Sequence, residues 1–313
     1  MSERDPTPVA VTSRSFSRNE VLRSETLARY ERVTFNDEGL SLAGDSLVAF
    51  LEGHPLAITA LERIDDGILA RLPDLRVISK VGVGIDMIDL EAMERHGVRL
   101  GWSRGTNARS VSELAIALML ALLRHLPSGT QLVREGEWRQ VQGSTLTGRT
   151  VGIIGFGHVG RDLAELLGAF SCRVLAHDVM PLSDLPGHVE QVSLELLLSS
   201  SEIVTLHAVL SDDTRNLLDR ERLGAMRPGA LVVNTSRGGL IDEQALFDAL
   251  SSGHLGGAAL DVFSSEPPGD HPLLGLEQVI VTPHIGGSTR EAVLAMGRAA
   301  IDGLGVAVPV AEL

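Results

Sequence analysis

Cysteine is almost absent from this sequence, because Cys172 is the only one in 313 residues. A single thiol cannot form an intrachain disulfide and offers no cysteine-based metal site, so we predict that the chain holds no metal. A chain without disulfides suits a reducing compartment. We therefore expect a cytoplasmic protein.

An excess of basic charge and a long apolar segment are missing as well. The formal net charge is −14, whereas a nucleic-acid surface needs clustered Lys and Arg. The longest apolar stretch, Leu114–Leu123, is shorter than the roughly 20 residues that cross a bilayer. The polar amino terminus "MSERDPTP" lacks the apolar core of a signal peptide. These features argue against nucleic acid and membrane as partners.

Short β-branched runs alternate with helical patterns along the chain, which is typical of parallel sheets covered by helices. A length of 313 residues favours two such domains. The strands expected in the first hundred residues are Val9–Val11, Leu47–Phe50, Val77–Ile78 and Val98–Leu100. A second, more regular series comprises Thr150–Gly155, Arg173–Asp178, Ile203–His207, Leu231–Ser236, Gly257–Phe263 and Val279–His284. Six strands in this rhythm predict an α/β fold with a doubly wound parallel sheet.

Two apolar helical stretches accompany these strands. The predicted helix 110–126 begins with Ser110 and Glu113 at capping-box spacing and continues as an almost unbroken apolar run. Such a helix must be buried on nearly every side, and we favour packing against a second copy in a homodimer over burial within one chain. Ser288 and Glu291 repeat the cap spacing before a second helix, which can cross back to the first domain.

A dinucleotide fingerprint follows the first strand of the second series. Gly155, Gly157 and Gly160 form G-x-G-x-x-G between a strand and a helix, which lets the backbone approach a pyrophosphate at the positive end of the helix. Asp178 ends the next strand, 18 residues after Gly160, where a carboxylate accepts hydrogen bonds from ribose and repels a 2′-phosphate. The pattern predicts NAD as cofactor. The alternative is a tight turn with a solvated aspartate.

Three later strand ends carry Arg237, Glu266 and His284, at the edge where a doubly wound sheet opens its ligand crevice. Reduction of a 2-oxo acid needs a proton donor for the carbonyl oxygen and a partner for the carboxylate. His284 suits the first task and the planar fork of Arg237 the second. Glu266 can hold His284 by a hydrogen bond and favour its charged form. Each residue alone also fits a structural role, as a helix cap, a solvated loop carboxylate or a strand-end histidine.

The motif order, with "NTSRGG", "DVFSSEP", "TPHIGG" and an upstream "VGVGIDMIDL", resembles the D-2-hydroxyacid dehydrogenase family, especially its phosphoglycerate-dehydrogenase-like members. The resemblance implies that Arg237, Glu266 and His284 are the catalytic residues. It implies a discontinuous, flavodoxin-like substrate domain of residues 1–102 and 285–313, with a Rossmann cofactor domain of residues 103–284 inserted. Family members are typically dimers. Because the sequence stops at Leu313, we expect no carboxy-terminal regulatory domain.

The resemblance also extends the predicted sites. The amides of Val83 and Gly84 match the family's carboxylate-binding loop, and Lys80 matches a position that contacts substrate phosphate. Val209 stands where the family pattern has proline, which leaves His207 open as either a cofactor residue or an ordinary strand end. In the upstream loop, Met87 changes one polar position of the pattern. The further predicted cofactor-binding residues are Phe156, His158, Val159, His207, Thr214, Thr235, Ser236, Asp261, Gly286 and Gly287.

The predicted function is an NAD-dependent dehydrogenase acting on a D-2-hydroxy or 2-oxo acid. Lys80 favours a substrate with a second anionic group, while Glu52 in an earlier loop argues against one. The alternatives are a hydroxypyruvate or glyoxylate reductase, then a phosphite dehydrogenase. A non-enzymatic NAD(H)-sensing protein similar to a corepressor stays open as a different class, because fold does not dictate function.

Overall fold

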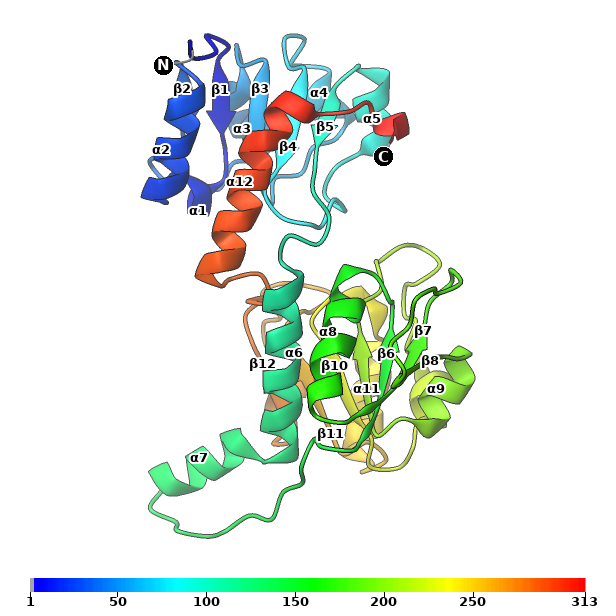
Figure 1. Ribbon diagram of the computed structural model, residues 1–313. Coiled ribbons are helices and arrows are strands. Elements are labelled where there is room, and N and C mark those ends of the chain that lie inside the picture. Colours follow the sequence, from blue (N-terminus) through cyan, green and yellow to red (C-terminus); the bar gives the residue numbers. More distant parts are fainter. Residues whose placement is uncertain (1–2, 313) are drawn as a thin grey trace. The chain divides into compact units, whose positions relative to one another are not determined.

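The computed structural model describes residues 3–312, which fall into two compact units (Figure 1). The first contains the residues up to Asn107 and from Ser288 onward, and the second contains Ala108–Gly287. Each unit is built on one sheet whose paired strands all run parallel. The predicted α/β class with two doubly wound sheets is confirmed.

The first unit contains a five-stranded sheet in the order β2-β1-β3-β4-β5, which is the flavodoxin-like order. Its strands are β1 (Val9–Val11), β2 (Val33–Phe35), β3 (Leu56–Thr59), β4 (Val77–Lys80) and β5 (Arg99–Gly101). Its helices are α1 (Arg14–Ser17), α2 (Glu20–Arg29), α3 (Gly44–Leu51), α4 (Asp66–Leu69), α5 (Leu90–Arg95), α12 (Arg290–Val306) and the short η3 (Val310–Glu312).

The second unit contains a seven-stranded sheet in the order β12-β11-β10-β9-β6-β7-β8. Its strands are β6 (Thr150–Ile154), β7 (Arg173–His177), β8 (Val189–Gln191), β9 (Ile203–Leu206), β10 (Leu231–Asn234), β11 (Gly257–Leu260) and β12 (Val279–Val281). Its helices are α6 (Ala108–Leu123), α7 (Leu126–Arg134), α8 (His158–Ala169), α9 (Leu194–Ser200), α10 (Arg220–Ala225), α11 (Glu243–Ser251), η1 (Gly238–Leu240) and η2 (Pro272–Gly275).

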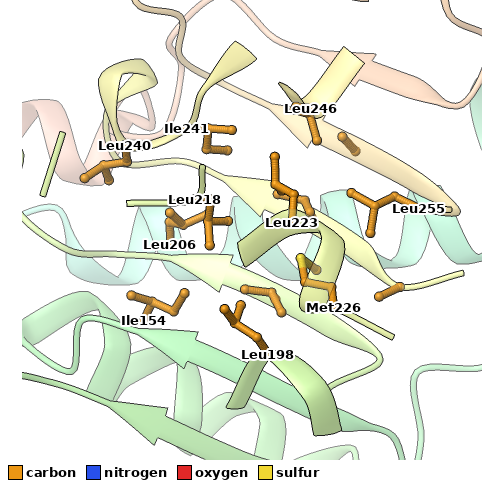
Figure 2. Packing of buried hydrophobic residues seen from close by; sticks show 14 of the residues in the cluster. Ile154, Leu198, Leu206, Leu218, Leu223, Met226, Leu240, Ile241, Leu246 and Leu255 are labelled. Carbon is orange, nitrogen blue, oxygen red and sulfur yellow. The ribbon is translucent and has the colours of Figure 1, made fainter. Parts of the chain in front are cut away.

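Both sheets are covered on two faces because successive strand residues point to opposite sides. In β1, Val9 and Val11 pack in one cluster with α12 residues such as Ile301, whereas Ala10 packs in the other cluster with Leu47 of α3. The second sheet follows the same rule. Its face toward α9, α10 and α11 is filled by residues from β9 and from those helices, including Leu206, Leu198, Leu223 and Leu246 (Figure 2).

Three elements of the first series differ from the sequence prediction. The expected strand Leu47–Phe50 is wrong, because these residues belong to α3. Leu47, Val48 and Leu51 are buried there, at the spacing of neighbours along one helix face. Strands β2 and β3 were not predicted, and neither was β8 at the edge of the second sheet. These three strands have only three or four residues each, which is too short for a clear periodic pattern.

The predicted caps of the two apolar helices are also wrong. Ser110 lies inside α6, which begins at Ala108, and its buried hydroxyl donates to Gly286 O. The amino-terminal cap of α12 is Thr289, whose side chain accepts from Ala292 N. The predicted helix 110–126 ends at Leu123, and α7 follows after a bend. Within residues 3–312 no single helix is long and apolar enough to cross a membrane, although α6 and α7, bent by 59°, satisfy the length and composition criteria as a pair.

Candidate active site

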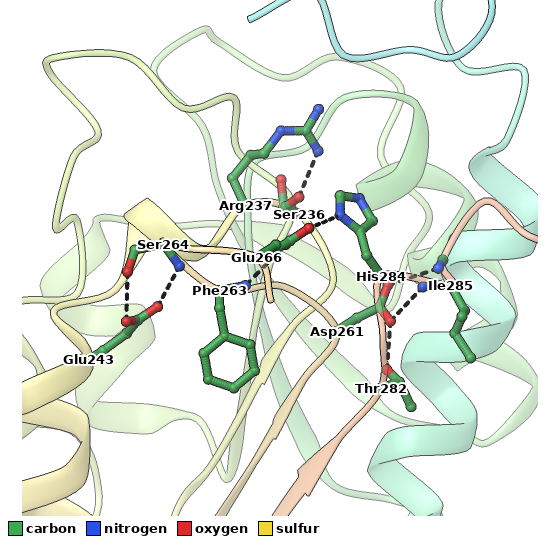
Figure 3. A network of polar contacts seen from close by, with 11 residues as sticks. Ser236, Arg237, Glu243, Asp261, Phe263, Ser264, Glu266, Thr282, His284 and Ile285 are labelled. Atoms are coloured by element: carbon green, nitrogen blue, oxygen red, sulfur yellow. Dashed lines mark hydrogen bonds and ion pairs between the residues drawn. The ribbon is translucent and has the colours of Figure 1, made fainter. Parts of the chain in front are cut away.

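Arg237, Glu266 and His284 follow three neighbouring strands of the second sheet, β10, β11 and β12 (Figure 3). Because parallel strands end at the same edge, the sheet order brings these three side chains to one place. In Figure 3, which draws the polar contacts around these strand ends, the side chain of Arg237 and the ring of His284 lie on the same side, and Glu266 lies beside that ring. The grouping predicted from the sequence is therefore present in the fold.

His284 and Glu266 form a close pair. His284 Nδ1 lies 2.7 Å from Glu266 Oε2, and Phe263 N donates to Glu266 Oε1 at 3.1 Å. Each carboxylate oxygen thus has a partner, which fixes the carboxylate in one orientation. The side chain of His284 is 45% exposed, so a small molecule can reach its ring. With Nδ1 facing the carboxylate, Nε2 is the ring atom that can exchange a proton with a substrate.

A buried aspartate holds the turn that presents His284. Asp261 is 1% exposed, and its carboxylate accepts hydrogen bonds from Thr282 Oγ1, Ile285 N and Gly286 N. His284 itself has a φ of 53°, a left-handed conformation that costs a residue with a side chain of order 1 kcal/mol and persists only where the surroundings impose it. The sequence prediction placed Asp261 near the cofactor. In the structure its carboxylate binds this turn.

The turn that carries Arg237 is fixed by the last residue of β10. Asn234 is fully buried, donates from Nδ2 to Arg237 O at 2.9 Å and accepts from Ser236 N at 3.0 Å. Ser236 Oγ donates to Ala208 O at 2.8 Å, so that hydroxyl links β10 to the loop after β9. Sequence reasoning missed Asn234, although an asparagine that ends a strand before "TSRGG" is a typical residue for bonding to the backbone two or three positions on.

The glycine loop after β6 fits a dinucleotide. A Cβ at Gly155 would lie 2.4 Å from Ala208 N, and one at Gly160 would lie 2.3 Å from Gly155 O. Neither position therefore accommodates a side chain. A Cβ at Gly157 would meet nothing within 4 Å, so the backbone there is accessible. Gly157 is the amino-terminal cap of α8 and has no side chain to bond to the helix, which leaves the first N–H groups of this helix available to bind an anion.

Asp178 lies where the fingerprint requires an acid. Its two oxygens accept from Phe156 N at 2.7 Å and from Met180 N at 3.0 Å, which fixes the carboxylate next to the glycine loop. Phe156 thus contributes its amide to Asp178, while its ring is buried. His158 is exposed, and Val159 is partly buried with its carbonyl accepting from Ser112 Oγ. After β10, the Thr235 hydroxyl is buried with no hydrogen-bond partner among the described residues.

The structure separates the two strand-end histidines. Desolvation lowers the pKa of His207 to about 3, so its ring is neutral near pH 7 and is poorly suited to deliver a proton. Its Nε2 lies 2.9 Å from Thr205 Oγ1, and its backbone N–H donates to Ile154 O. Thr214 Oγ1 donates to Val209 O and accepts from Ser211 N, which closes the following loop. Direct cofactor contacts of His207 and Thr214 stay predictions.

The predicted substrate residues Lys80, Val83 and Gly84 belong to the first unit. Lys80 ends β4, is 4% exposed, and donates from Nζ to Val81 O at 2.9 Å. Trp102 Nε1 donates to Val83 O at 3.0 Å, so an indole holds the loop that carries the two predicted amides. No group of three or more His, Cys, Asp or Glu side chains is placed to hold a metal ion anywhere in the described part of the chain.

Comparison with known proteins identifies the family. Residues 116–286 match the model of the "D-isomer specific 2-hydroxyacid dehydrogenase, NAD binding domain". The chain is 39% identical over 258 residues to a hydroxypyruvate reductase of Thermotoga maritima, covering 80% of this chain and 84% of the relative. It is 38% identical over 250 residues to a D-3-phosphoglycerate dehydrogenase of Mycobacterium bovis, covering 79% of this chain but only 47% of that relative.

The fold comparison agrees with these sequence matches. The structure of an NAD-dependent formate dehydrogenase from Staphylococcus aureus, solved in complex with NAD, has a TM-score of 0.81 and 30% identity, and the match covers 95% of this chain and 93% of that one. The family match spans the glycine loop, Asp178 and the turn of His284. The chain therefore belongs to the D-2-hydroxyacid dehydrogenase family and is an NAD-dependent oxidoreductase.

Proposed function

We propose that the chain transfers a hydride between NAD and the carbonyl or hydroxyl carbon of a D-2-hydroxy or 2-oxo acid, with His284 moving the proton. The observation that carries the proposal is the 2.7 Å contact between His284 Nδ1 and Glu266 Oε2. The nicotinamide supplies or accepts the hydride. During reduction His284 Nε2 donates a proton to the carbonyl oxygen, and Glu266 stabilises the imidazolium beforehand. During oxidation the neutral ring accepts the proton.

Arg237 has the second role in this proposal. Its planar guanidinium binds the substrate carboxylate through two N–H groups and polarises the adjacent carbonyl. Gly155, Gly157, Gly160 and Asp178 hold the cofactor, and Thr235 borders it. We also propose that His158, Val159, Ser236, Gly286 and Gly287 border the cofactor. The unit Ala108–Gly287 would then be the cofactor domain, and the first unit would be the substrate domain.

We further propose that the preferred substrate has a second anionic group, such as a phosphate, phosphonate or carboxylate. Lys80 is the only lysine in the sequence, and its ammonium bonds to the loop that carries Val83 and Gly84. In this arrangement the amides of Val83 and Gly84 bind one anionic group and the ammonium binds the other. A small acid such as hydroxypyruvate is the second candidate, favoured by the hydroxypyruvate reductase named above.

A panel of 2-oxo acids tests the substrate proposal. NADH oxidation by the purified protein should be faster, at equal concentration, with 3-phosphohydroxypyruvate or 2-oxoglutarate than with hydroxypyruvate, glyoxylate or pyruvate. Lys80→Met should raise KM for the doubly anionic acids by about 10- to 100-fold, because a hydrogen bond to a charged group contributes about 1.5–3 kcal/mol. Lys80→Arg should keep most of the affinity, and Arg63→Met, which removes an 84% exposed side chain, is the matched control.

The other outcomes of the panel are equally informative. Preference for hydroxypyruvate or glyoxylate, with no effect of Lys80→Met, would contradict the doubly anionic substrate and leave the mechanism standing. Tight NADH binding without turnover of any acid would contradict both, and phosphite and formate would then be tested with NAD. If phosphite and formate are not oxidised either, the result would favour a non-enzymatic NAD(H) sensor.

We propose a homodimer in which α6 and the segment 124–144 contact the second copy. The chain leaves one stripe of α6 incompletely covered, with Glu113 and Ala117 exposed and Leu120 partly buried. Helix α7 has no buried residue, and the exposed large apolar side chains of the segment are Leu126, Val133, Trp138 and Val141. Several large apolar side chains exposed on one segment mark an interaction surface.

Sedimentation equilibrium tests the dimer. The wild-type protein should have twice the mass of one chain at micromolar concentration. The double substitution Val133→Asp and Trp138→Ser should shift it to the monomer, because the first change places a charge in the interface and the second removes its largest side chain. Leu61→Ser, at a 74% exposed leucine of the first unit, should leave the mass unchanged. A monomeric wild type would contradict the proposal.

We also propose a cytoplasmic location, supported by the single, buried thiol of Cys172. Cell fractionation would test this location.

A further inference from the structure

The loop between β11 and η2 carries Glu266 and is attached to helix α11. Glu243, the first residue of α11, accepts hydrogen bonds from Ser264 N at 2.6 Å and Ser264 Oγ at 2.7 Å (Figure 3). Its Oε2 also lies 3.2 Å from His271 Nε2. The side chain of Glu243 is only 14% exposed. This carboxylate therefore binds the Glu266 loop two residues before and five residues after Glu266.

Backbone packing joins the same loop to the turn of Arg237. A Cβ at Gly238 would lie 1.9 Å from Phe263 C and 2.2 Å from Ser264 N, so only glycine allows the two segments to approach this closely. Gly238 directly follows Arg237, and Ser264 is the residue that Glu243 binds. The turn of Arg237, the start of α11 and the Glu266 loop thus form one packed assembly.

The remaining contacts lead from this assembly to His284. Phe263 N, which precedes the anchored Ser264, donates to Glu266 Oε1, and Glu266 Oε2 faces His284 Nδ1. The ring of Phe263 lies against that of His271, with centroids 5.5 Å apart. A shift of Ser264 would therefore move the amide that orients the Glu266 carboxylate, and with it the partner of His284.

We propose that Glu243 is a positioning residue for the reaction: by holding Ser264 and His271 it keeps Glu266 aligned on His284. The proposal rests on the proposed function, because it matters only if the Glu266–His284 pair moves a proton. The competing explanation is that Glu243 has a purely structural role. A carboxylate in the first turn of a helix stabilises that helix whatever lies nearby, and loss of such a contact would lower stability without touching the chemistry.

A double-mutant cycle separates the two explanations, since residues that act through one another give non-additive effects. The variants are Glu243→Gln, Glu266→Gln and the double substitution, each assayed for kcat and kcat/KM across pH, for NADH affinity by fluorescence and for melting temperature. We expect Glu243→Gln to lower kcat by about 10-fold, since small misplacements of reacting groups have effects of this order or larger. In the Glu266→Gln background the same change should lower kcat by less than about twofold.

Three further readouts accompany the cycle. The pH profile of Glu243→Gln should shift in the same direction as that of Glu266→Gln, while NADH affinity stays within about twofold, because α8 and the glycine loop are untouched. Ser264→Ala, which removes one of the three contacts, should give a smaller change of the same kind. Glu20→Gln is the matched control, because Glu20 is the exposed first residue of α2 behind an asparagine cap, and it should leave kcat unchanged.

The two possible failures are distinguishable. If Glu243→Gln lowers kcat by the same factor in both backgrounds, or lowers only the melting temperature, the positioning role is wrong and the proposed function stands. If Glu266→Gln alone leaves kcat unchanged, the proposed role of Glu266 is wrong, and the positioning role of Glu243 is overturned with it.

Discussion

Replacing His284 with asparagine should lower kcat by a factor of about 10² to 10⁴, which is the usual contribution of a positioned general acid or base. Asparagine can keep a hydrogen bond to Glu266, and it tolerates the left-handed backbone at this position better than most residues do. It cannot exchange a proton near neutral pH. The measurement is steady-state NADH oxidation with the best acid of the panel, together with NADH binding, which should be unchanged.

A second histidine provides the control for this substitution. His96 Nε2 lies 3.1 Å from Asp66 Oδ1 in the first unit, so it is also a partly exposed histidine beside a carboxylate. His96→Asn should leave kcat within about twofold, because exposed pairs of this kind contribute about 1 kcal/mol or less to stability and nothing to the reaction. A His284→Asn enzyme that keeps more than about a third of the wild-type kcat would show that another group moves the proton.

The site could be predicted from the sequence because its parts follow strong local signals. Short apolar runs identified β10, β11 and β12, and the rule that ligands bind at the carboxyl ends of parallel strands then grouped Arg237, Glu266 and His284. The glycine loop and Asp178 were predictable in the same way, since a strand, three glycines, a helix and an acid follow one another in order.

The residues that hold these side chains were not predictable, because their partners lie far away in sequence. Glu243 meets Ser264 across 21 positions and Asp261 meets Gly286 across 25, and no local periodicity encodes such pairs. Asn234 is the exception, since its side chain bonds to residues two and three positions later in the sequence. The strand predicted at 47–50 was wrong for a different reason. A short apolar run fits a buried strand and a buried helix equally well, so the local pattern could not distinguish the two.

The role of His207 was a further point that the sequence left open, since this residue fits either a cofactor contact or an ordinary strand end. His207 and His284 both follow strands of the same sheet, and the sequence prediction gave the proton to His284. Desolvation lowers the pKa of His207 to about 3, which keeps its ring neutral near pH 7, whereas His284 is 45% exposed beside a carboxylate. Exposure is a tertiary property and requires the fold.

Arg237→Lys should lower kcat/KM for the preferred acid by a factor of about 10² to 10³, although the charge is retained. The proposed grip on the carboxylate uses two parallel N–H groups of one plane, whereas an ammonium is a point charge on a flexible stem. Loss of one or both charge-assisted bonds, each contributing about 1.5–3 kcal/mol, corresponds to about 10- to 10⁴-fold. The expected loss lies within these limits because the ammonium keeps the charge. Arg237 Nη1 donates to Ser236 O, and a guanidinium with five N–H donors can make that bond and a bidentate one.

Two comparisons make the Arg237 result decisive. Arg222→Lys is the matched control, because Arg222 Nη1 also donates to a backbone carbonyl, that of Leu217 at 2.9 Å, in a helix that carries none of the proposed site residues; it should leave kcat/KM unchanged. NADH affinity should be the same in all three proteins, since the glycine loop and Asp178 bind the cofactor in this mechanism. A Lys variant with kcat/KM within about threefold of wild type would mean that the substrate carboxylate is bound elsewhere. The loss should fall on KM, because the carboxylate is held in both the bound substrate and the transition state, and also on kcat, because Arg237 polarises the carbonyl as it reacts.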